Sequence, residues 1–473
     1  MTLARLWAFL AVGLPVLATL IANLSAVDLA YHLRAGGITL DTGHIPTVDT
    51  FTFTAPGAAW LNQQWGAQVI LAAIYRVAGW TGLTLLRAAL VGATFGCLFE
   101  ACRRRGLDLR RAAWLTLAAF VVSAVALALR PQLIGMALFA LTLLLVADRR
   151  AHPRRVWAVP LIVLVWANIH GSFFLGPVVL GLAWLEDIHA GNPGRHRMLG
   201  LAVASAVAAF VNPFTIGVWA YAVGLSTNSF VTSRISEWQP TTLRTIPGIA
   251  FFGSVALTAA LLARRGRATP WPTLLWLALF AAIGAYAIRG VAWWPLGAVV
   301  AVAGVLVARD PAETPSRTQT ERPSRINVVL VAMIAIVCVA LVPFWRPIDP
   351  KVGAPAGVVG DAPVGITEAL RGLVKPGDRI LNPQPWGSWF EFALPQATVA
   401  LDSRIELFPA QVWDDYDTIR RGGDGWQAIL ARWNPTWIVA TEDEKAFTTR
   451  IEGLGWAVFH KDRDGTVLAA PSR

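Results

Sequence analysis

The sequence predicts a mainly α-helical protein: a polytopic membrane helix bundle of about eleven spans, followed by a C-terminal extracytoplasmic α/β domain. Two observations carry this prediction. Of the 473 residues, 55% are hydrophobic and only 15% are charged, whereas about 25% of the residues in an average soluble domain are charged. The apolar residues also gather in stretches close to the ~20 residues that a helix needs to cross a bilayer. This composition excludes a disordered, fibrous or ordinary cytosolic protein.

The first expected span runs from about Leu6 to Val27. It is longer than the apolar region of a cleaved signal peptide, about 7–15 residues, so a retained anchor is favoured and cleavage near Ala26 is the alternative. The stretch 60–78 is also apolar, but its Asn, Gln and Arg side chains fit an interfacial amphipathic helix better than a span. The further spans are expected at 81–101, 112–129, 133–147, 156–169, 172–187, 198–211, 246–263, 270–288, 291–308 and 326–345.

The distribution of arginine orients this bundle. Residues 1–345 contain 26 Arg, no Lys and 12 acidic residues, whereas residues 346–473 contain 14 basic and 17 acidic residues. The positive excess therefore belongs to the membrane part, and a nucleic-acid partner is not expected. With 60–78 in the interface, 19 of the 26 Arg fall on one side, which the positive-inside rule identifies as the cytoplasm. We expect a multi-pass protein of the cytoplasmic membrane, with a cytoplasmic N-terminus, a first external loop at 28–79 and a cytoplasmic linker at 309–325.

The bundle is expected to occupy residues 1–345, and the remaining residues, 346–473, to form a domain outside the cytoplasm. Short apolar strand candidates at 378–381, 398–401, 437–440 and 456–460 alternate with helical patterns at 364–373, 409–420, 425–433 and 443–453. Strands interleaved with helices predict a small layered α/β domain. Because this pattern is complete without the spans, we expect residues from about 360 to 473 to fold on their own.

Two acidic residues in the first external loop are candidates for acid–base chemistry. Asp28 stands at the outer end of the first expected span, and His32 follows four residues later, on the same face of a helix. A carboxylate there can act as general base toward an acceptor hydroxyl or amine; the alternative is an aspartate that merely begins an amphipathic loop helix. Asp49 is its rival in the same loop. We assign Asp28, Asp49 and His32 to the catalytic group, with Asp28 as the base.

Arginines on the same face are candidates for phosphate binding. Arg130 and Arg289 lie where spans emerge outward, and Arg34 lies in the first external loop. Guanidinium groups bind a lipid-linked phosphate by charge-assisted, bidentate hydrogen bonds; helix-end arginines that snorkel to the interface are the alternative. Sugar transfer from a lipid phosphate needs one base and a stabilised leaving phosphate, rather than the carboxylate pair of most glycoside hydrolases. The expected acceptor-side or site-lining residues are Asn168, His170, Asn212 and Glu237.

No sequence pattern indicates a cofactor or a metal. A GxxxxGK phosphate loop is absent, and neither an HExxH motif nor a Cys/His cluster indicates zinc. We therefore expect neither a cofactor nor a metal site.

Three segments of the first external loop carry a resemblance to a known family: 28–37 (DLAYHLRAGG), 42–54 (TGHIPTVDTFTFT) and 60–65 (WLNQQW). They resemble the corresponding loop of bacterial multi-spanning glycosyltransferases of the GT-C superfamily. Later segments resemble the same proteins in the same order: 130–132 (RPQ), 166–171 (WANIHG), 211–213 (VNP), 382–389 (NPQPWGSW) and 401–404 (LDSR). The resemblance implies a helical bundle with an extracytoplasmic domain, a polyprenyl-phosphate-linked sugar donor, and an inverting transfer with Asp28 as base. Many of these enzymes carry adjacent acids in this loop, whereas Asp28 is flanked by Val27 and Leu29, and this departure weakens the metal-dependent version.

The leading hypothesis is therefore a membrane glycosyltransferase that moves a sugar from a polyprenyl-phosphate donor to an envelope glycan, lipid or protein on the outer face. The alternative is a transporter, or a lipid- or glycan-binding assembly protein of the same fold, without chemistry. Many transporters contain internal repeats with broken helices in matching halves. No clear repeat is present here, and the charged groups gather at one face, which favours the enzyme.

Overall fold

The computed structural model describes residues 1–227, 234–264, 268–307 and 322–471. Two compact units are present: residues 1–22 with 84–342, and residues 23–83 with 343–473. The first expected loop, 28–79, thus groups with the C-terminal part of the chain, whereas the sequence predicted it as part of the bundle. Most of the expected linker 309–325 lies outside the described residues.

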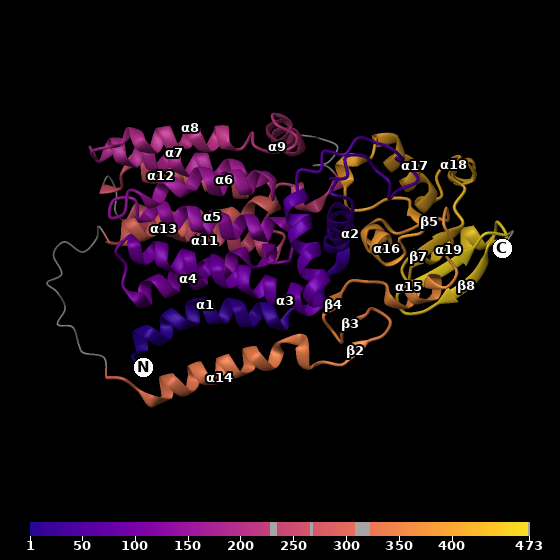
Figure 1. Ribbon diagram of the computed structural model, residues 1–473, viewed down its shortest axis with the longest axis horizontal. Helices are drawn as coiled ribbons and strands as arrows, with labels where there is room; N and C mark the ends of the chain where they lie inside the picture. The colour runs from indigo at the N-terminus through magenta and orange to yellow at the C-terminus, as the bar shows by residue number, and fades with distance from the viewer. Residues whose placement is uncertain (228–233, 265–267, 308–321, 472–473) are drawn as a thin grey trace. The chain divides into compact units, whose positions relative to one another are not determined.

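The first unit is a helix bundle (Figure 1). Proline lies in the first turn of several of its helices, where its missing N–H costs no hydrogen bond; Pro131 and Pro247 are examples. The bundle helices are α1 (Leu3–Ile21), the later part of α3 (Trp65–Arg104), α4 (Leu109–Ser123), α5 (Pro131–Ala147), α6 (Val159–Ala167), α7 (Leu175–His189), α8 (His196–Ala208), α9 (Gly217–Thr227), α11 (Ile246–Ala263), α12 (Trp271–Tyr286), α13 (Trp293–Val307) and α14 (Arg325–Leu341).

The predicted helical membrane bundle is confirmed as a fold. Six helices in the described part of the chain are long and apolar enough to cross a membrane: Leu3–Ile21, Trp65–Arg104, Leu109–Ala126, Gly171–His189, Ile246–Ala263 and Ile288–Val307. Five shorter apolar helices correspond to the other expected spans: Pro131–Ala147, Arg155–Ala167, His196–Ala208, Trp271–Tyr286 and Arg325–Leu341. Each of the eleven expected segments therefore coincides with one apolar helix.

Two boundaries in the N-terminal region differ from the expectation. The first helix ends at Ile21 instead of Val27, because Leu24 and Ser25 form strand β1 (Leu24–Ser25), which pairs in parallel with β4 (Val359–Gly360). The expected interfacial helix at 60–78 begins at Trp65 and continues as α3 to Arg104, broken at Gly79. Gly79 has φ 53°, a left-handed conformation that glycine adopts without steric cost.

The core of the bundle is aromatic. Phe139 of α5 lies 5.5 Å from Trp293, 5.7 Å from Phe280 and 6.2 Å from Trp166, measured between ring centroids. All four rings are buried. These tilted and edge-on contacts hold α5, α6, α12 and α13 together.

The second unit contains a five-stranded mixed sheet, which confirms the predicted α/β domain. The strand order is β6-β5-β7-β9-β8, parallel from β6 to β7 and antiparallel beyond. The strands are β5 (Arg379–Leu381), β6 (Thr398–Val399), β7 (Trp437–Thr441), β8 (Ala457–Lys461) and β9 (Gly465–Ala469); β2 (Ile348–Asp349) and β3 (Ala354–Pro355) form a separate pair. The helices are α2 (Ala26–Thr42), α15 (Val364–Arg371), α16 (Gly387–Ala393), α17 (Ala410–Arg421), α18 (Trp426–Trp433) and α19 (Lys445–Glu452).

The segment 51–53 extends this sheet beyond β6. Thr52 forms a parallel bridge with Val399. The Phe53 N–H donates to the Val399 carbonyl at 3.0 Å, and the Val399 N–H donates to the Phe51 carbonyl at 3.1 Å. Residues far apart in the sequence therefore share one sheet, and α2 packs against α16 in the same unit.

Candidate functional site

Within the bundle, three predicted site residues stand where helices begin. Arg130 is the N-cap of α5, and His170 is the N-cap of the 3₁₀ helix η3 (Gly171–Phe174), which leads into α7. Arg289 lies in the 3₁₀ helix η6 (Ile288–Ala292), which leads into α13. The N-terminal end of a helix carries partial positive charge and unsatisfied N–H groups, so this end of the bundle favours an anion.

Glu237 joins the two arginines. Its Oε1 lies 2.7 Å from Arg130 Nη1 and its Oε2 lies 3.4 Å from Arg289 Nη2. The Arg289 guanidinium also lies 5.3 Å above the ring of Trp238. Burial alone would raise the pKa of Glu237, but the charges of Arg289 and Arg130 hold it below the ordinary value, so this carboxylate is ionised at neutral pH.

The two arginines are not fully used by this carboxylate. Their side chains are 25% and 29% exposed, and that of Glu237 is 40% exposed. The Nε of Arg289 is buried and has no hydrogen-bond partner among the described residues. The Nε–H of Arg289 is therefore a donor that the Glu237 carboxylate does not occupy.

His170 is held neutral beside this pair. The backbone N–H of Ser172 donates to His170 Nδ1 at 3.2 Å, and Ser172 Oγ lies 2.7 Å from the same nitrogen. Nδ1 is therefore the acceptor, and the ring proton belongs on Nε2. Burial, followed by the charge of Arg289, lowers the pKa of His170 to about 3. A neutral histidine here can donate a hydrogen bond without adding charge.

Asn168 and Asn212 shape the backbone. Asn168 Nδ2 donates to the carbonyls of Leu164 and Val211, at 2.9 and 3.0 Å. Asn212 Nδ2 donates to Ala209 O at 2.7 Å, and its Oδ1 accepts from the Phe214 N–H at 2.7 Å. These bonds satisfy groups left open where α6 and α8 end.

The predicted residues of the first external loop lie in the second unit. Asp28 and His32 stand one turn apart in α2, so Asp28 begins this helix and does not close α1. The side chain of Asp28 lies outside the described residues. His32 is buried, with its ring centroid 4.0 Å from that of Tyr31. Arg34 donates to the carbonyls of Glu391 and Pro395, and its guanidinium lies 4.7 Å from the centre of the Phe51 ring.

Asp49 belongs to a buried ion cluster, which we define as Arg34, Asp49, Glu391, Asp402 and Arg404. Asp49 Oδ1 accepts from Arg404 Nη2 at 2.6 Å and from the Phe51 N–H at 3.2 Å. Its Oδ2 accepts from the N–H and the hydroxyl of Thr52, at 3.1 and 2.6 Å. Arg404 donates also to Asp402 and lies over the rings of Phe51 and Trp60. Both oxygens of Asp49 are therefore occupied by partners from the protein.

Glu391 completes the buried ion cluster. Its Oε1 lies 3.7 Å from Arg404 Nη2, and the side chain is fully buried. Burial and the neighbouring Asp402 raise the pKa of Glu391 well above its ordinary value, so we take this acid as neutral. The sequence pointed to Asp402 and Arg404 only as part of the segment LDSR, and it did not point to Trp238 or Glu391. The sequence signal nearest to Trp238 was its neighbour Glu237, and the one nearest to Glu391 was Trp389, the last residue of the segment NPQPWGSW.

The fold of this chain is the GT-C fold. No family model matches the sequence, and no curated protein matches it. The archaeal oligosaccharyltransferase AglB from Archaeoglobus fulgidus, solved with an inhibitory peptide and a dolichol-phosphate, superposes with a TM-score of 0.56 at 12% identity, over 92% of this chain and 69% of AglB. ArnT from Cupriavidus metallidurans in the apo state superposes with a TM-score of 0.52 at 14% identity, over 98% of this chain and 97% of ArnT. At these identities the likeness establishes the fold alone.

Proposed function

We propose that this protein transfers a sugar from a polyprenyl-phosphate-linked donor to an envelope glycan, lipid or protein at the outer face of the cytoplasmic membrane. The GT-C fold supports the general class, and one solved structure of that fold holds a dolichol-phosphate. The observation that carries the proposal for this chain is the pair Arg130 and Arg289, which converge on the single carboxylate of Glu237.

A phosphate group fits the donors of this pair. The Arg289 Nε has a hydrogen to donate and no acceptor among the described residues, and both guanidinium groups are partly exposed. A lipid phosphate supplies both the negative charge and the acceptor oxygens. The helix starts at Arg130 and His170 add their partial positive charge. In this role Arg130 and Arg289 stabilise the phosphate as it leaves, while Glu237 fixes the two guanidinium groups and His170 lines the site.

Asp28 is the general base of this proposal. Glu237 has a lowered pKa and two arginine partners, and Asp49 is enclosed by four donors, so neither is suited to accept a proton. Asp28 takes the proton of an acceptor hydroxyl or amine while that oxygen or nitrogen bonds to the anomeric carbon. The bond from that carbon to the phosphate oxygen breaks in the same inverting step, and the lipid phosphate leaves with the electron pair. The N-terminus is cytoplasmic and the C-terminal domain is outside in this arrangement.

The test uses the full-length protein in nanodiscs. Asp28→Asn should lower transfer of a radiolabelled sugar from its polyprenyl-phosphate carrier into envelope material by roughly 10²–10⁴-fold, the usual contribution of a positioned base. Binding of polyprenyl phosphate should persist in this variant. Asp41→Asn is the matched control, because Asp41 lies in the same helix and, in the described part of the chain, its side chain forms an exposed ion pair with Arg76. Normal turnover in Asp28→Asn would show that the base is misassigned.

The phosphate site is tested separately by binding. Arg130→Gln and Arg289→Gln should each weaken binding of polyprenyl phosphate about ten- to a hundredfold, the effect of losing one charge-assisted hydrogen bond. Arg244→Gln serves as control, since Arg244 is an exposed arginine in a neighbouring loop. Equal binding in all three variants would exclude this site. Binding that depends on both arginines, without transfer in the wild type, would instead favour the non-catalytic lipid-binding alternative.

A further inference from the structure

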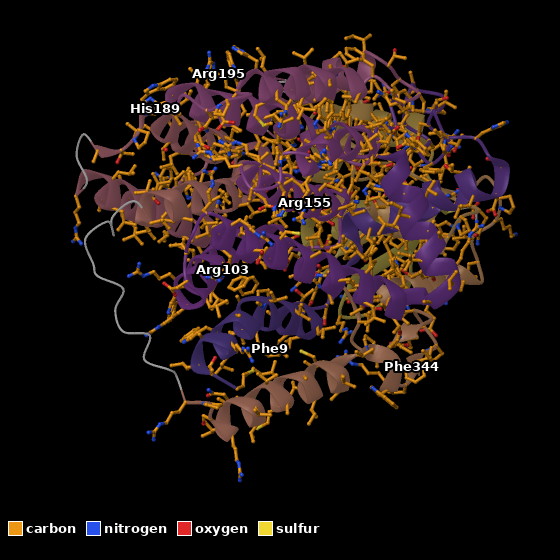
Figure 2. All side chains as sticks on the ribbon, turned by 60° about the vertical axis from the view of Figure 1, so that its left-hand side comes forward. Phe9, Arg103, Arg155, His189, Arg195 and Phe344 are labelled. Carbon is orange, nitrogen blue, oxygen red and sulfur yellow. The ribbon has the colours of Figure 1, made fainter. Side chains whose placement is uncertain are left out.

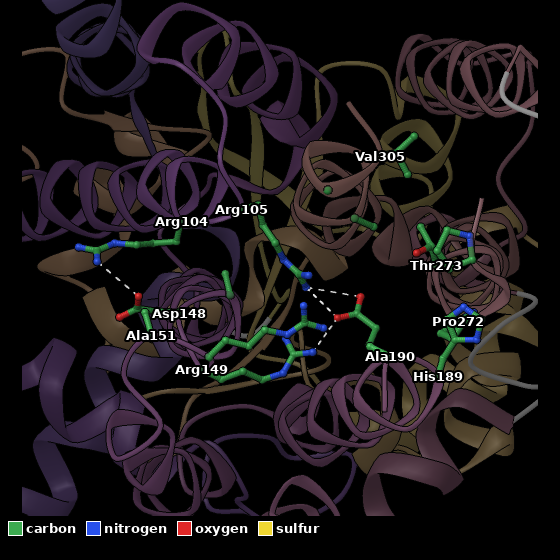
Figure 3. Close-up of a pocket in the computed structure, with 16 residues that line it drawn as sticks. Arg104, Arg105, Asp148, Arg149, Ala151, His189, Ala190, Pro272, Thr273 and Val305 are labelled. Atoms are coloured by element: carbon green, nitrogen blue, oxygen red, sulfur yellow. Dashed lines mark hydrogen bonds and ion pairs between the residues drawn. The ribbon is translucent and has the colours of Figure 1, made fainter. Parts of the chain in front are cut away.

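A second polar site lies at the opposite end of α5. Helix α5 has 17 residues, which corresponds to about 25 Å of helix rise, with Arg130 at one end and Asp148 at the other. Next to Asp148 a pocket of about 460 Å³ opens among the ends of α3, α5, α7, α12 and α13 (Figure 3). Figure 2 shows Arg103, Arg155, His189 and Arg195 at this end of the bundle. The pocket is within the ordinary size range of small-molecule sites, about 300–1,000 Å³.

Arginine dominates the pocket wall. Four arginines, Arg104, Arg105, Arg149 and Arg150, line it together with two carboxylates, Asp148 and Glu186. Arg104 also pairs with Glu100, and Arg150 with Asp187, outside the lining. The residues that line the pocket themselves carry more positive than negative charge, which attracts anions.

The two carboxylates are already neutralised by partners. Asp148 lies 3.3 Å from Arg104 Nη1, 3.0 Å from Arg155 Nη1 and 2.8 Å from His152 Nδ1. Glu186 lies 3.1 Å from Arg105 Nη2 and 2.9 Å from Arg149 Nη2. Neither acid is therefore left to repel a bound anion.

Arg149 and Arg105 differ in how many of their guanidinium donors have hydrogen-bond partners. Arg149 is buried and binds Asp187 and Glu186 as well as the carbonyls of Val146 and Ala183, so it ties the helix ends together. Arg105 contacts Glu186 through Nη2, and its Nε is buried without a hydrogen-bond partner among the described residues. The side chain of Arg105 is 17% exposed, and a guanidinium group has five N–H donors. Arg105 therefore keeps donors for an anion in the pocket in addition to its contact with Glu186.

Small residues keep the opposite wall open. Ala301, Gly304 and Val305 of α13 line the pocket. A Cβ added at Gly304 would meet no atom within 4 Å. The space in front of Gly304 is therefore real volume, and a longer side chain could enter it without a backbone clash.

We propose that this pocket binds a phosphate-bearing anion, with Arg105 as its principal ligand. The anion is either the headgroup of an anionic phospholipid or a soluble phosphate compound, because both present phosphate oxygens that match the two parallel N–H donors of a planar guanidinium group. By the predicted topology the pocket opens toward the cytoplasm, on the far side from the sugar-transfer site. The inference is thus independent of the proposed function.

Two arms of one experiment distinguish the sources, using the full-length protein in nanodiscs. In the first arm, phosphatidylcholine nanodiscs are titrated with pyrophosphate. In the second, phosphatidylglycerol is titrated into the same nanodiscs, and retained lipid is counted by native mass spectrometry. Thermal unfolding of each sample reports binding as a shift of the midpoint. Binding in either arm supports the site and identifies its source.

Two variants and two controls locate the binding. Arg105→Gln should weaken binding about ten- to a hundredfold, and it should fold because Arg149 still pairs with Glu186. Gly304→Leu should fill the pocket and weaken binding as well. Arg110→Gln removes an exposed arginine of the same side, and Gly253→Leu enlarges another helical glycine whose Cβ has open space; both should bind as the wild type does. Absence of binding in both arms, or equal binding in Arg105→Gln and Arg110→Gln, would overturn the proposal.

Discussion

Replacing Asp49 by Asn should destabilise the second unit without touching chemistry directly. The buried carboxylate holds Arg404 at 2.6 Å and receives three further hydrogen bonds, from Phe51 and Thr52. An asparagine keeps one oxygen, while its NH₂ group faces donors that need an acceptor, and Arg404 loses a counter-charge. Breaking a buried ion pair by removing one partner costs about 3–5 kcal/mol, a large share of the ~5–15 kcal/mol that holds a domain folded.

Hydrogen exchange of the full-length protein measures this effect where it should appear. The amides of Phe53 and Val399 join segment 51–53 to β6. Because every 1.4 kcal/mol changes an equilibrium tenfold, their exchange should accelerate roughly a hundred- to several-thousandfold in Asp49→Asn. Asp41→Asn is the control, since the exposed Asp41–Arg76 pair is of the surface type worth about 0–1 kcal/mol. Normal protection in Asp49→Asn combined with lost sugar transfer would refute the structural role and return Asp49 to the catalytic group.

Three further outcomes are expected. Because the pKa of Glu237 is lowered in the folded protein, its ionised form stabilises the fold at neutral pH, and this contribution disappears as the pH falls through that lowered pKa. The thermal unfolding midpoint of the wild type should therefore exceed that of Glu237→Gln near pH 7. The difference between the two midpoints should vanish in acid. Gly387→Ala places a methyl group 1.9 Å from the Leu401 carbonyl oxygen and should lower the stability of the second unit by about 1–3 kcal/mol, measured by hydrogen exchange in β5. The amides of residues 343–473 should be less protected from hydrogen exchange when this segment is expressed alone than when it is co-expressed with residues 23–83. Equal protection would mean that the first loop does not stabilise the C-terminal domain.

Local sequence patterns predicted the elements of the second unit well. The apolar run 437–440 is strand β7, and the helical pattern at 425–433 is α18. Strand β9 was missed, although the Asp-Gly pair at 464–465 is a hairpin signal. Helix α2 was treated as loop because its polar residues obscure the helical period. Its inward side is nevertheless buried, as Ala30 and Leu33 show, so packing in the folded unit decides its conformation.

The partners of the buried ion cluster could not be read from the sequence. Asp49 and Arg404 are separated by more than 350 residues, and no local period or motif spacing links them. The pattern of strands and helices accordingly predicted a C-terminal domain that is complete after about residue 360, whereas the contacts of segment 51–53 show that the loop supplies an edge of its sheet. The pair Arg130 and Arg289 was easier to find, because both stand at helix starts where an arginine is conspicuous.

Contacts and exposure explain why arginines that look alike in the sequence have different roles. In the buried ion cluster, Arg404 pairs with the carboxylates of Asp49 and Asp402, while Arg34 donates to the backbone carbonyls of Glu391 and Pro395. The three acidic side chains of the cluster are buried, and an added phosphate would bring further negative charge into that site. At the bundle end, the side chains of Arg130, Arg289 and Glu237 are partly exposed, and the Nε–H of Arg289 lacks an acceptor among the described residues. An anion there can receive hydrogen bonds that the protein does not itself satisfy, which is the physical reason to seek the lipid phosphate at Arg130 and Arg289 and not at Arg34.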